Sequence, residues 1–339
     1  MEFSKNIFPN QKFDSSLFAP NVSKKNDERE TLLSVSRRAM NVEFEVLFPR
    51  SIFPQGTEAA IAALDEVERL ENVLSVFRFD SRVQYINLTA YDEVVKVDEE
   101  LLSLVNICQT ISEQTNGAVD ITSGLLWKLW GFSVGKGVVP DEDKIAEALR
   151  SVDYKSLAID QENQTIRFLK PSMELNFGCV GKGFAIDTAS KRLCDLGVNR
   201  FMFHGGLSSI LVKGEKWRVG ITDPLRGDQR LAELLLSNCA ISTSSSQKQF
   251  FRSKGHRYSH LIDPRTGFPA EGVFSVTVIA STGALAELLS TAFFVMGYEQ
   301  SKEYQEKHPE IAALFVLPTK SKNKNHEIKT IGKFPETQL

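Results

Sequence analysis

The sequence predicts a fold that mixes α and β structure, because it contains both helical and strand-like periodicities. Apolar residues recur near helical spacing in Thr57–Glu71. Leu157–Asp160 and Thr165–Leu169 are instead short β-like runs on either side of Gln-Glu-Asn-Gln, a pattern typical of a hairpin. With 339 residues, 42% of them hydrophobic and 24% charged, the chain can bury a sizeable core in one large domain or two small ones.

The other elements are predicted in chain order from the same periodicities. Arg38–Phe48 alternates as a strand does, and a helix is expected over Asp98–Thr115, with Asp98 as its cap and Gly117 as its stop. A glycine turn then opens a helix that Gly197 closes, and Leu285–Met296 is a further apolar helix. Later strands are expected at Glu174–Phe177, Arg200–Phe203, Ser208–Val212, Trp217–Ile221, Cys239–Thr243, Phe274–Ile279 and Ala312–Leu317.

The ends of the chain are more polar than its centre. Residues 1–33 are expected to form a disordered or draped arm, residues 34–318 the folded domain, and residues 319–339 a polar tail.

Charge and composition limit the classes of function. A net charge of -3 with dispersed basic residues disfavours nucleic acid as a partner. The four cysteines show neither CxxC nor zinc-site spacing, so we expect buried residues or free thiols. No apolar stretch is long enough for a membrane span, and the printed N-terminus has neither a signal peptide nor a lipobox. A cytoplasmic protein is expected from the printed sequence, or an extracytoplasmic one if a longer chain was trimmed.

The segment from His260 to Gly267 places a histidine, a carboxylate and a hydroxyl close together. His260, Asp263 and Thr266 are typical of a reactive site. Asp-Pro-Arg-Thr-Gly is also a β-turn sequence, and an isolated histidine is more often structural, so both interpretations stay open.

Polar residues on an otherwise apolar helix form a second candidate. Glu287, Ser290 and Thr291 stand at i, i+3 and i+4 on one face. A carboxylate and a hydroxyl there suit a hard cation such as Mg²⁺. The alternative is a solvent-facing carboxylate near the helix N-terminus, with Thr291 bonded to the backbone.

Two glycine-containing turns are weaker signals. Gly178, Gly181 and Gly183 surround Lys182 at a helix N-terminus, which favours a phosphate, although the spacing matches neither the P-loop nor the Rossmann fingerprint. The alternative is a tight turn with a solvated lysine. Gly205-Gly206 after a strand marks a turn or bulge as readily as a ligand site.

Polar and aromatic side chains also gather between Asn116 and Phe132. Asp120 and Thr122 precede Trp127 and Trp130. This combination suits a flat ring such as isoalloxazine or adenine, whereas ordinary core packing is the alternative.

Taken in order, these segments resemble the ApbE family of FAD:protein FMN transferases, from about Arg38 to Leu317. The motifs that carry the resemblance are Arg38-Ala-Met40, Ser75-x-Phe77-Arg78 with Asp80-Ser81 and Ile86-Asn87, Asn116-Gly-Ala-Val-Asp120, Leu129-Trp-Gly-Phe132, Gly181-Lys-Gly-Phe-Ala-Ile-Asp187, Gly205-Gly206, Trp217-Arg-Val-Gly-Ile-Thr-Asp-Pro224, Ser242-Thr-Ser244 and His260-Leu-Ile-Asp-Pro-Arg-Thr-Gly267.

The resemblance implies an ApbE-like fold of the α+β class with a T-fold-like core, mixed sheets and packed helices. It also implies an FAD cleft and a Mg²⁺ ion at the FAD pyrophosphate. The metal ligands it implies are Gly181, Glu287 and Thr291, and His260 with its neighbour Asp263 is implied as the catalytic pair. The acceptor is a redox protein with a Ser/Thr-Gly-Ala-Thr/Ser-like motif. The residues expected to bind FAD are Met40, Asp120, Thr122, Trp130, Lys182, Asp187, Gly205, Gly206, Thr243, His260 and Thr266.

The chain departs from the family pattern at several of these places. Glu287 replaces an aspartate and is one methylene longer, and Gly181 replaces an alanine. Three short motifs also differ, and here they read Met40-Asn-Val42, Gly205-Gly-Leu207 and Thr243-Ser-Ser-Ser-Gln247. Three functions therefore remain in view: FMN transfer, an FAD pyrophosphatase that gives FMN and AMP, and a non-catalytic flavin-binding or scaffold homologue.

Overall fold

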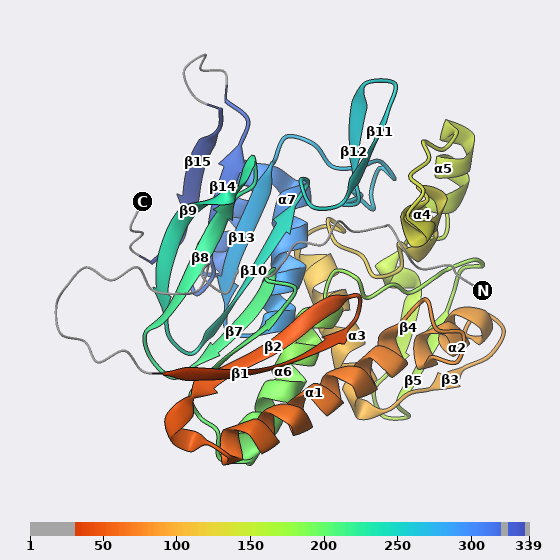
Figure 1. The fold of residues 1–339 in the computed structure, drawn as a ribbon. Helices are drawn as coiled ribbons and strands as arrows, with labels where there is room; N and C mark the ends of the chain where they lie inside the picture. The colour runs from red at the N-terminus through yellow and green to blue at the C-terminus, as the bar shows by residue number, and fades with distance from the viewer. Residues whose placement is uncertain (1–30, 320–324, 336–339) are drawn as a thin grey trace, which may run out of the picture.

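An antiparallel sheet forms the centre of the computed structural model, which describes residues 31–319 and 325–335 (Figure 1). Its spatial order is β1-β2-β6-β7-β10-β13-β14-β15. The strands are β1 (Leu32–Ala39), β2 (Val42–Pro49), β6 (Phe201–Gly205), β7 (Ser209–Lys213), β10 (Cys239–Ser245), β13 (Ser275–Ala280), β14 (Ala312–Leu317) and β15 (Glu327–Ile331).

Helices cover one face of this sheet and a hairpin covers the other (Figure 1). Strand alternation explains the division: Phe201 and Phe203 pack under the helices, whereas Met202 faces the hairpin. The helical layer consists of α1 (Gln55–Leu74), α6 (Gly181–Asp195) and α7 (Gly283–Lys307), and the hairpin of β8 (Trp217–Asp223) and β9 (Arg226–Leu236).

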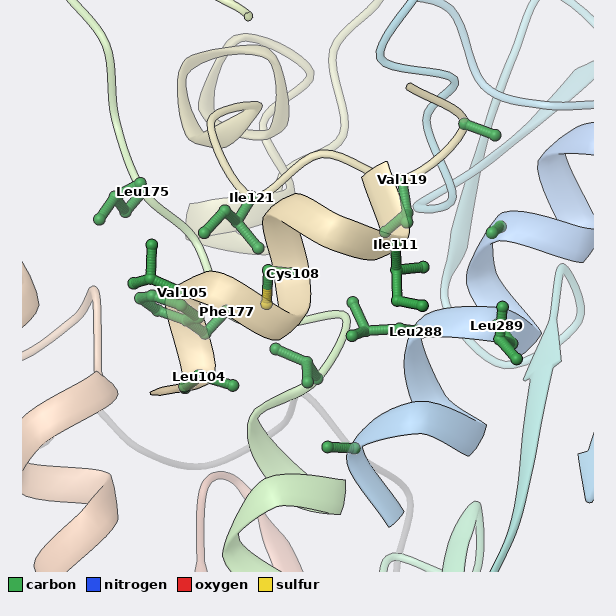
Figure 2. Packing of buried hydrophobic residues seen from close by; sticks show 14 of the residues in the cluster. Leu104, Val105, Cys108, Ile111, Val119, Ile121, Leu175, Phe177, Leu288 and Leu289 are labelled. Atoms are coloured by element: carbon green, nitrogen blue, oxygen red, sulfur yellow. The ribbon is translucent and has the colours of Figure 1, made fainter. Parts of the chain in front are cut away.

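A smaller part of the fold packs against α7 through α3 (Glu99–Gln114). Figure 2 shows Cys108 of α3 among buried side chains, with Ile111 near Leu288 of α7. All four cysteines are free, as expected, and Cys108 is buried. The remaining elements are α2 (Arg82–Thr89), β3 (Val95–Lys96), α4 (Gly124–Leu129), α5 (Glu142–Leu149), β4 (Leu157–Asp160), β5 (Thr165–Phe168), β11 (Phe250–Ser253) and β12 (His256–Ser259).

Most predicted elements are confirmed, including the Asp98 cap, which accepts a hydrogen bond from Leu101 N at 2.8 Å. The single strand predicted at Arg38–Phe48 is wrong. Met40 and Asn41 both have positive φ and turn the chain between β1 and β2, so the alternation continues across a hairpin.

The strand predicted at Glu174–Phe177 is also wrong. Leu175 pairs with the side-chain amide of Asn87, which accepts from its N–H at 2.7 Å and donates to its carbonyl at 3.1 Å. A side chain therefore replaces the partner strand, and only an isolated bridge at Glu174 remains.

The chain ends add one correction and leave one expectation open. β15 lies inside the predicted polar tail and pairs with β14, so part of that tail belongs to the sheet. The predicted arm covers residues 1–33, of which 1–30 lie outside the described residues, and β1 begins at Leu32. None of the helices in the described ranges has the length and apolar character that a bilayer span requires.

The N-termini of α6 and α7 meet at two glycines. A Cβ atom on Gly183 would lie 2.2 Å from the carbonyl oxygen of Gly283, and one on Gly283 would lie 2.6 Å from the carbonyl oxygen of Gly183. Asp187 of α6 reinforces the contact by accepting from Gly283 N at 2.6 Å and Ala284 N at 2.9 Å. The backbones therefore touch without an intervening side chain.

We expect Gly183→Ala to lower the free energy of unfolding by about 2–3 kcal/mol, because the methyl group must push the two backbones apart. Gly181→Ala is the matched control, since its Cβ would meet only Phe177 Cβ at 4.0 Å. The control should change stability by less than about 1 kcal/mol, towards greater stability. Urea unfolding of both variants checks this, and equal stabilities would contradict the steric argument.

Candidate active site

Glu287 lies at the crossing of α6 and α7, with its side chain almost fully buried. Its Oε2 accepts from Gly183 N at 2.7 Å and its Oε1 accepts from Ser209 Oγ at 2.7 Å. Lys182 Nζ forms an ion pair with Oε1. The carboxylate therefore faces an ammonium and the N-terminus of α6, not solvent, and both of these positive groups stabilise its charge.

Hydroxyl groups continue from Glu287 along the next turn of α7. Ser244 Oγ lies 2.8 Å from Ser290 Oγ and 3.3 Å from Thr291 Oγ1. The neighbouring Thr243 is instead 2.9 Å from Thr277 across the β10–β13 pair. The predicted polar face of α7 is thus present and meets the end of β10.

The oxygen ligands at this point suit Mg²⁺ only if a substrate completes them. Within the described ranges, no three His, Cys, Asp or Glu side chains gather to hold a metal ion. Mg²⁺ is often bound by one or two carboxylates together with substrate phosphates. The Glu287 carboxylate, already opposite the Lys182 ammonium, and the Thr291 hydroxyl on the same helical face fit that description.

Asp187 has a structural task. Its two carboxylate oxygens accept from the first N–H groups of α7, so the side chain caps one helix from the other. The pKa of Asp187 is raised to about 6, because burial, together with the smaller effect of the Glu287 charge, outweighs the two amide hydrogen bonds that lower it. The contacts of Asp187 thus form the helix crossing, and its predicted part in FAD binding stays a prediction.

His260 follows β12 and is held by the loop after β10. Its Nδ1 lies 3.0 Å from the carbonyl oxygen of Gln249, and its backbone N–H donates to the same oxygen at 3.1 Å. Because a carbonyl oxygen only accepts, Nδ1 carries the hydrogen and Nε2 keeps its lone pair. Burial and, to a lesser degree, the charges of Lys182 and Lys248 lower the pKa of His260 to about 4. The imidazole is therefore neutral near pH 7 and oriented for accepting a proton at Nε2.

Asp263 and Thr266 stabilise the turn that follows His260. Asp263 accepts from Arg265 N and Nε at 2.9 Å and pairs with its Nη2 at 2.8 Å. Thr266 Oγ1 accepts from Phe268 N at 3.3 Å. The turn interpretation is confirmed. Both carboxylate oxygens of Asp263 accept hydrogen bonds from Arg265.

The same turn borders a cavity of about 390 Å³. Val295 of α7 lies in its wall, one helical turn after Thr291. A slightly larger groove of about 420 Å³ runs along α3 and contains none of the predicted site residues. The cavity beside the turn is lined by Tyr258, Asp263, Thr266, Phe268, Pro269, Ala270, Glu271 and Val295.

Trp130 is fully buried and packs against the turn that contains Asp263 and Thr266. Its indole Nε1 donates to Gly267 O at 2.8 Å, and its ring packs against Tyr258 and Phe268. Core packing, the alternative interpretation of this aromatic residue, is thus confirmed. Phe132 from the same segment lies edge-on to His260, with ring centroids 6.4 Å apart.

The side chains of Asp120 and Thr122 are buried and bind the backbone at Asp153 and Tyr154. Asp120 accepts from Thr122 Oγ1 at 2.7 Å and from Tyr154 N at 2.9 Å, while Thr122 Oγ1 accepts from Asp153 N at 2.9 Å. Burial raises the pKa of Asp120, partly offset by these hydrogen bonds. Neither side chain contacts Glu287 or His260 in these bonds, and their role in FAD binding stays a prediction.

Met40, Gly205 and Gly206 lie at turns at one end of the sheet. A Cβ on Gly205 would meet the Phe44 ring at 2.8 Å, and one on Gly206 would meet Val42 at 2.8 Å. Close packing on β2 therefore requires both glycines. The turn leads directly to Ser209, whose hydroxyl binds Glu287, so it borders the site.

Two contributors had no signal in the sequence, and a third lay in a motif without an assigned role. Ser209 follows a turn and Gln249 acts through its backbone carbonyl, whereas Ser244 belongs to the Ser242-Thr-Ser244 motif. Only the fold identifies them as neighbours of Glu287, His260 and Thr291.

Comparison with known proteins agrees with this arrangement. The ApbE family model matches residues 40–315. An FAD:protein FMN transferase of Treponema pallidum (strain Nichols) is 34% identical over 76% of this chain and 78% of its own length. One of Haemophilus influenzae is 26% identical over 86% and 88%.

Solved structures show the same fold. The ApbE protein of Thermotoga maritima superimposes with a TM-score of 0.80 and 30% identity over 89% of this chain and 97% of its own. The flavinyl transferase ApbE of Pseudomonas stutzeri gives 0.78 and 26% over 89% and 95%. These matches confirm the predicted ApbE-like α+β fold, and the chain belongs to the ApbE family.

Proposed function

We propose that this protein transfers FMN from FAD to a Ser or Thr hydroxyl of an acceptor flavoprotein and releases AMP. The observation that carries the proposal is the fixed tautomer of His260, whose Nδ1–H is held by Gln249 O so that Nε2 is free to accept a proton. The relatives named FAD:protein FMN transferase support the general reaction.

The chemistry is a phosphoryl-group displacement. The acceptor hydroxyl gives its proton to His260 Nε2 while its oxygen forms a bond to the FMN phosphorus. The phosphoanhydride bond breaks, and AMP leaves with the electron pair. Lys182 and the first amides of α6 would stabilise negative charge on the phosphates.

Glu287, Thr291 and the carbonyl of Gly181 are the residues that would hold Mg²⁺. Bound there, the ion would neutralise charge on the pyrophosphate. Lys182 must release Glu287 Oε1 for that oxygen to bind the metal, since one carboxylate oxygen now serves both Lys182 and Ser209. The released ammonium is then free to contact a phosphate oxygen.

The direct test is the intact mass of an acceptor domain carrying a Ser/Thr-Gly-Ala-Thr motif after incubation with FAD, Mg²⁺ and this protein. We expect a gain of one FMN unit that disappears with EDTA and returns with Mg²⁺. FMN and AMP formed without an acceptor adduct would indicate the pyrophosphatase, and intact FAD would indicate a flavin-binding homologue.

We expect His260→Ala to lower the rate of transfer roughly 10²- to 10⁴-fold with little change in FAD affinity, because a general base acts mainly in the transition state. His256→Ala is the control, since His256 is exposed on the same hairpin. Single-turnover rates and FAD titrations separate the two effects. Equal losses of rate and affinity would make His260 a binding residue.

Glu287→Gln should abolish the effect of Mg²⁺ on thermal stability. In the wild type, Mg²⁺ added with ADP should raise the melting temperature, because both bind the folded state. The variant lacks the carboxylate charge, whereas the control Glu299→Gln changes an exposed residue of the same helix. A magnesium-dependent shift of equal size in Glu287→Gln would remove Glu287 from the metal site.

A further inference from the structure

Lys248 lies in the loop between β10 and β11, which hydrogen bonds from Arg257 hold in place. Arg257 of β12 donates from Nη2 to Ser246 O at 2.7 Å and also bonds the side chain of Gln247. Its guanidinium carbon sits 3.6 Å from the centre of the Phe250 ring. The residues on both sides of Lys248 are thereby tied to the hairpin that precedes His260.

The residue after Lys248 is tied to His260 itself. Gln249 O accepts from both the backbone N–H and the Nδ1–H of His260, at 3.1 and 3.0 Å. Lys248 is therefore held one residue away from the group that fixes the imidazole. A shift of this loop would also move His260.

Lys248 adds a second positive charge beside His260, where Lys182 already supplies one. Ser244, four residues before Lys248, lies 3.3 Å from Thr291, one turn of α7 after the Glu287 that pairs with Lys182. The side chain of Lys248 is exposed at this end of the site. Burial and, to a lesser degree, the charges of Lys182 and Lys248 lower the pKa of His260. Lys182 pairs with Glu287, whereas no carboxylate lies within ion-pair distance of Lys248 in the part of the chain that the structure describes. The region between the two lysines and His260 therefore has an uncompensated positive charge, which favours an anion.

We propose that Lys248 binds a phosphate oxygen of a diphosphate, which it holds together with Lys182 next to His260. The inference rests on the proposed function, in which the diphosphate is that of FAD. Neither the motifs that resemble the family nor the polar face of α7 includes Lys248. The lysine would hold the phosphates in front of Nε2 of His260 and stabilise negative charge on the departing phosphate.

Calorimetric titration with inorganic pyrophosphate in EDTA tests the proposal without metal or turnover. We expect Lys248→Met to weaken binding roughly tenfold, the loss of one charge-assisted hydrogen bond. Lys254→Met is the matched control, because Lys254 is exposed like Lys248 but lies at the tip of the β11–β12 hairpin. Lys248→Arg should retain most of the affinity because it keeps the charge.

The outcomes separate this inference from the proposed function. Weaker binding in Lys248→Met alone, with an unchanged melting temperature, supports the anion site even if no FMN is transferred to any acceptor. Equal affinities in Lys248→Met and Lys254→Met overturn it, and so does the absence of pyrophosphate binding by the wild type. A Lys248→Met variant that melts early is replaced by Lys248→Arg and Lys248→Gln, whose affinities should then differ by roughly tenfold.

Discussion

The direct contact between the N-termini of α6 and α7 is the constraint on which the site depends. Each helix supplies a carboxylate to the other: Glu287 of α7 accepts from Gly183 N, and Asp187 of α6 accepts from Gly283 N and Ala284 N. The two glycines allow the backbones close enough for both bonds. The orphan amides of two helix ends and two buried carboxylates thus satisfy one another.

The two carboxylates of this reciprocal arrangement differ in their partners. Asp187 uses both oxygens on backbone amides, and its pKa of about 6 reflects burial that these bonds only partly offset. Glu287 shares its oxygens with the amide of Gly183, the hydroxyl of Ser209 and the ammonium of Lys182. Of these, the lysine is the flexible partner and the one that a ligand can draw away. The Glu287 side chain reaches across the crossing to Gly183.

The sequence predicted what depends on local pattern and missed what depends on distant partners. Periodicity and caps predicted α3 and α6, and the spacing of Glu287 and Thr291 predicted a polar face on α7. Alternation failed at Glu174–Phe177, where the amide of Asn87 takes the place of a strand. Local pattern also could not place Gln249 O beside His260, or Ser209 beside Glu287, or Lys248 near either residue. Backbone carbonyls, serines and lysines occur throughout a sequence, so their positions do not identify distant partners.

The charges around His260 suggest how substrate binding prepares the base. Without an anion, burial and two lysines hold its pKa at about 4, so Nε2 is a weak proton acceptor. In the proposed function, a bound diphosphate would compensate both ammonium charges and, being negative itself, would favour the imidazolium. Its arrival would therefore raise the pKa of His260. In this scheme the substrate that needs the base also strengthens it, and Gln249 O keeps Nε2 oriented throughout.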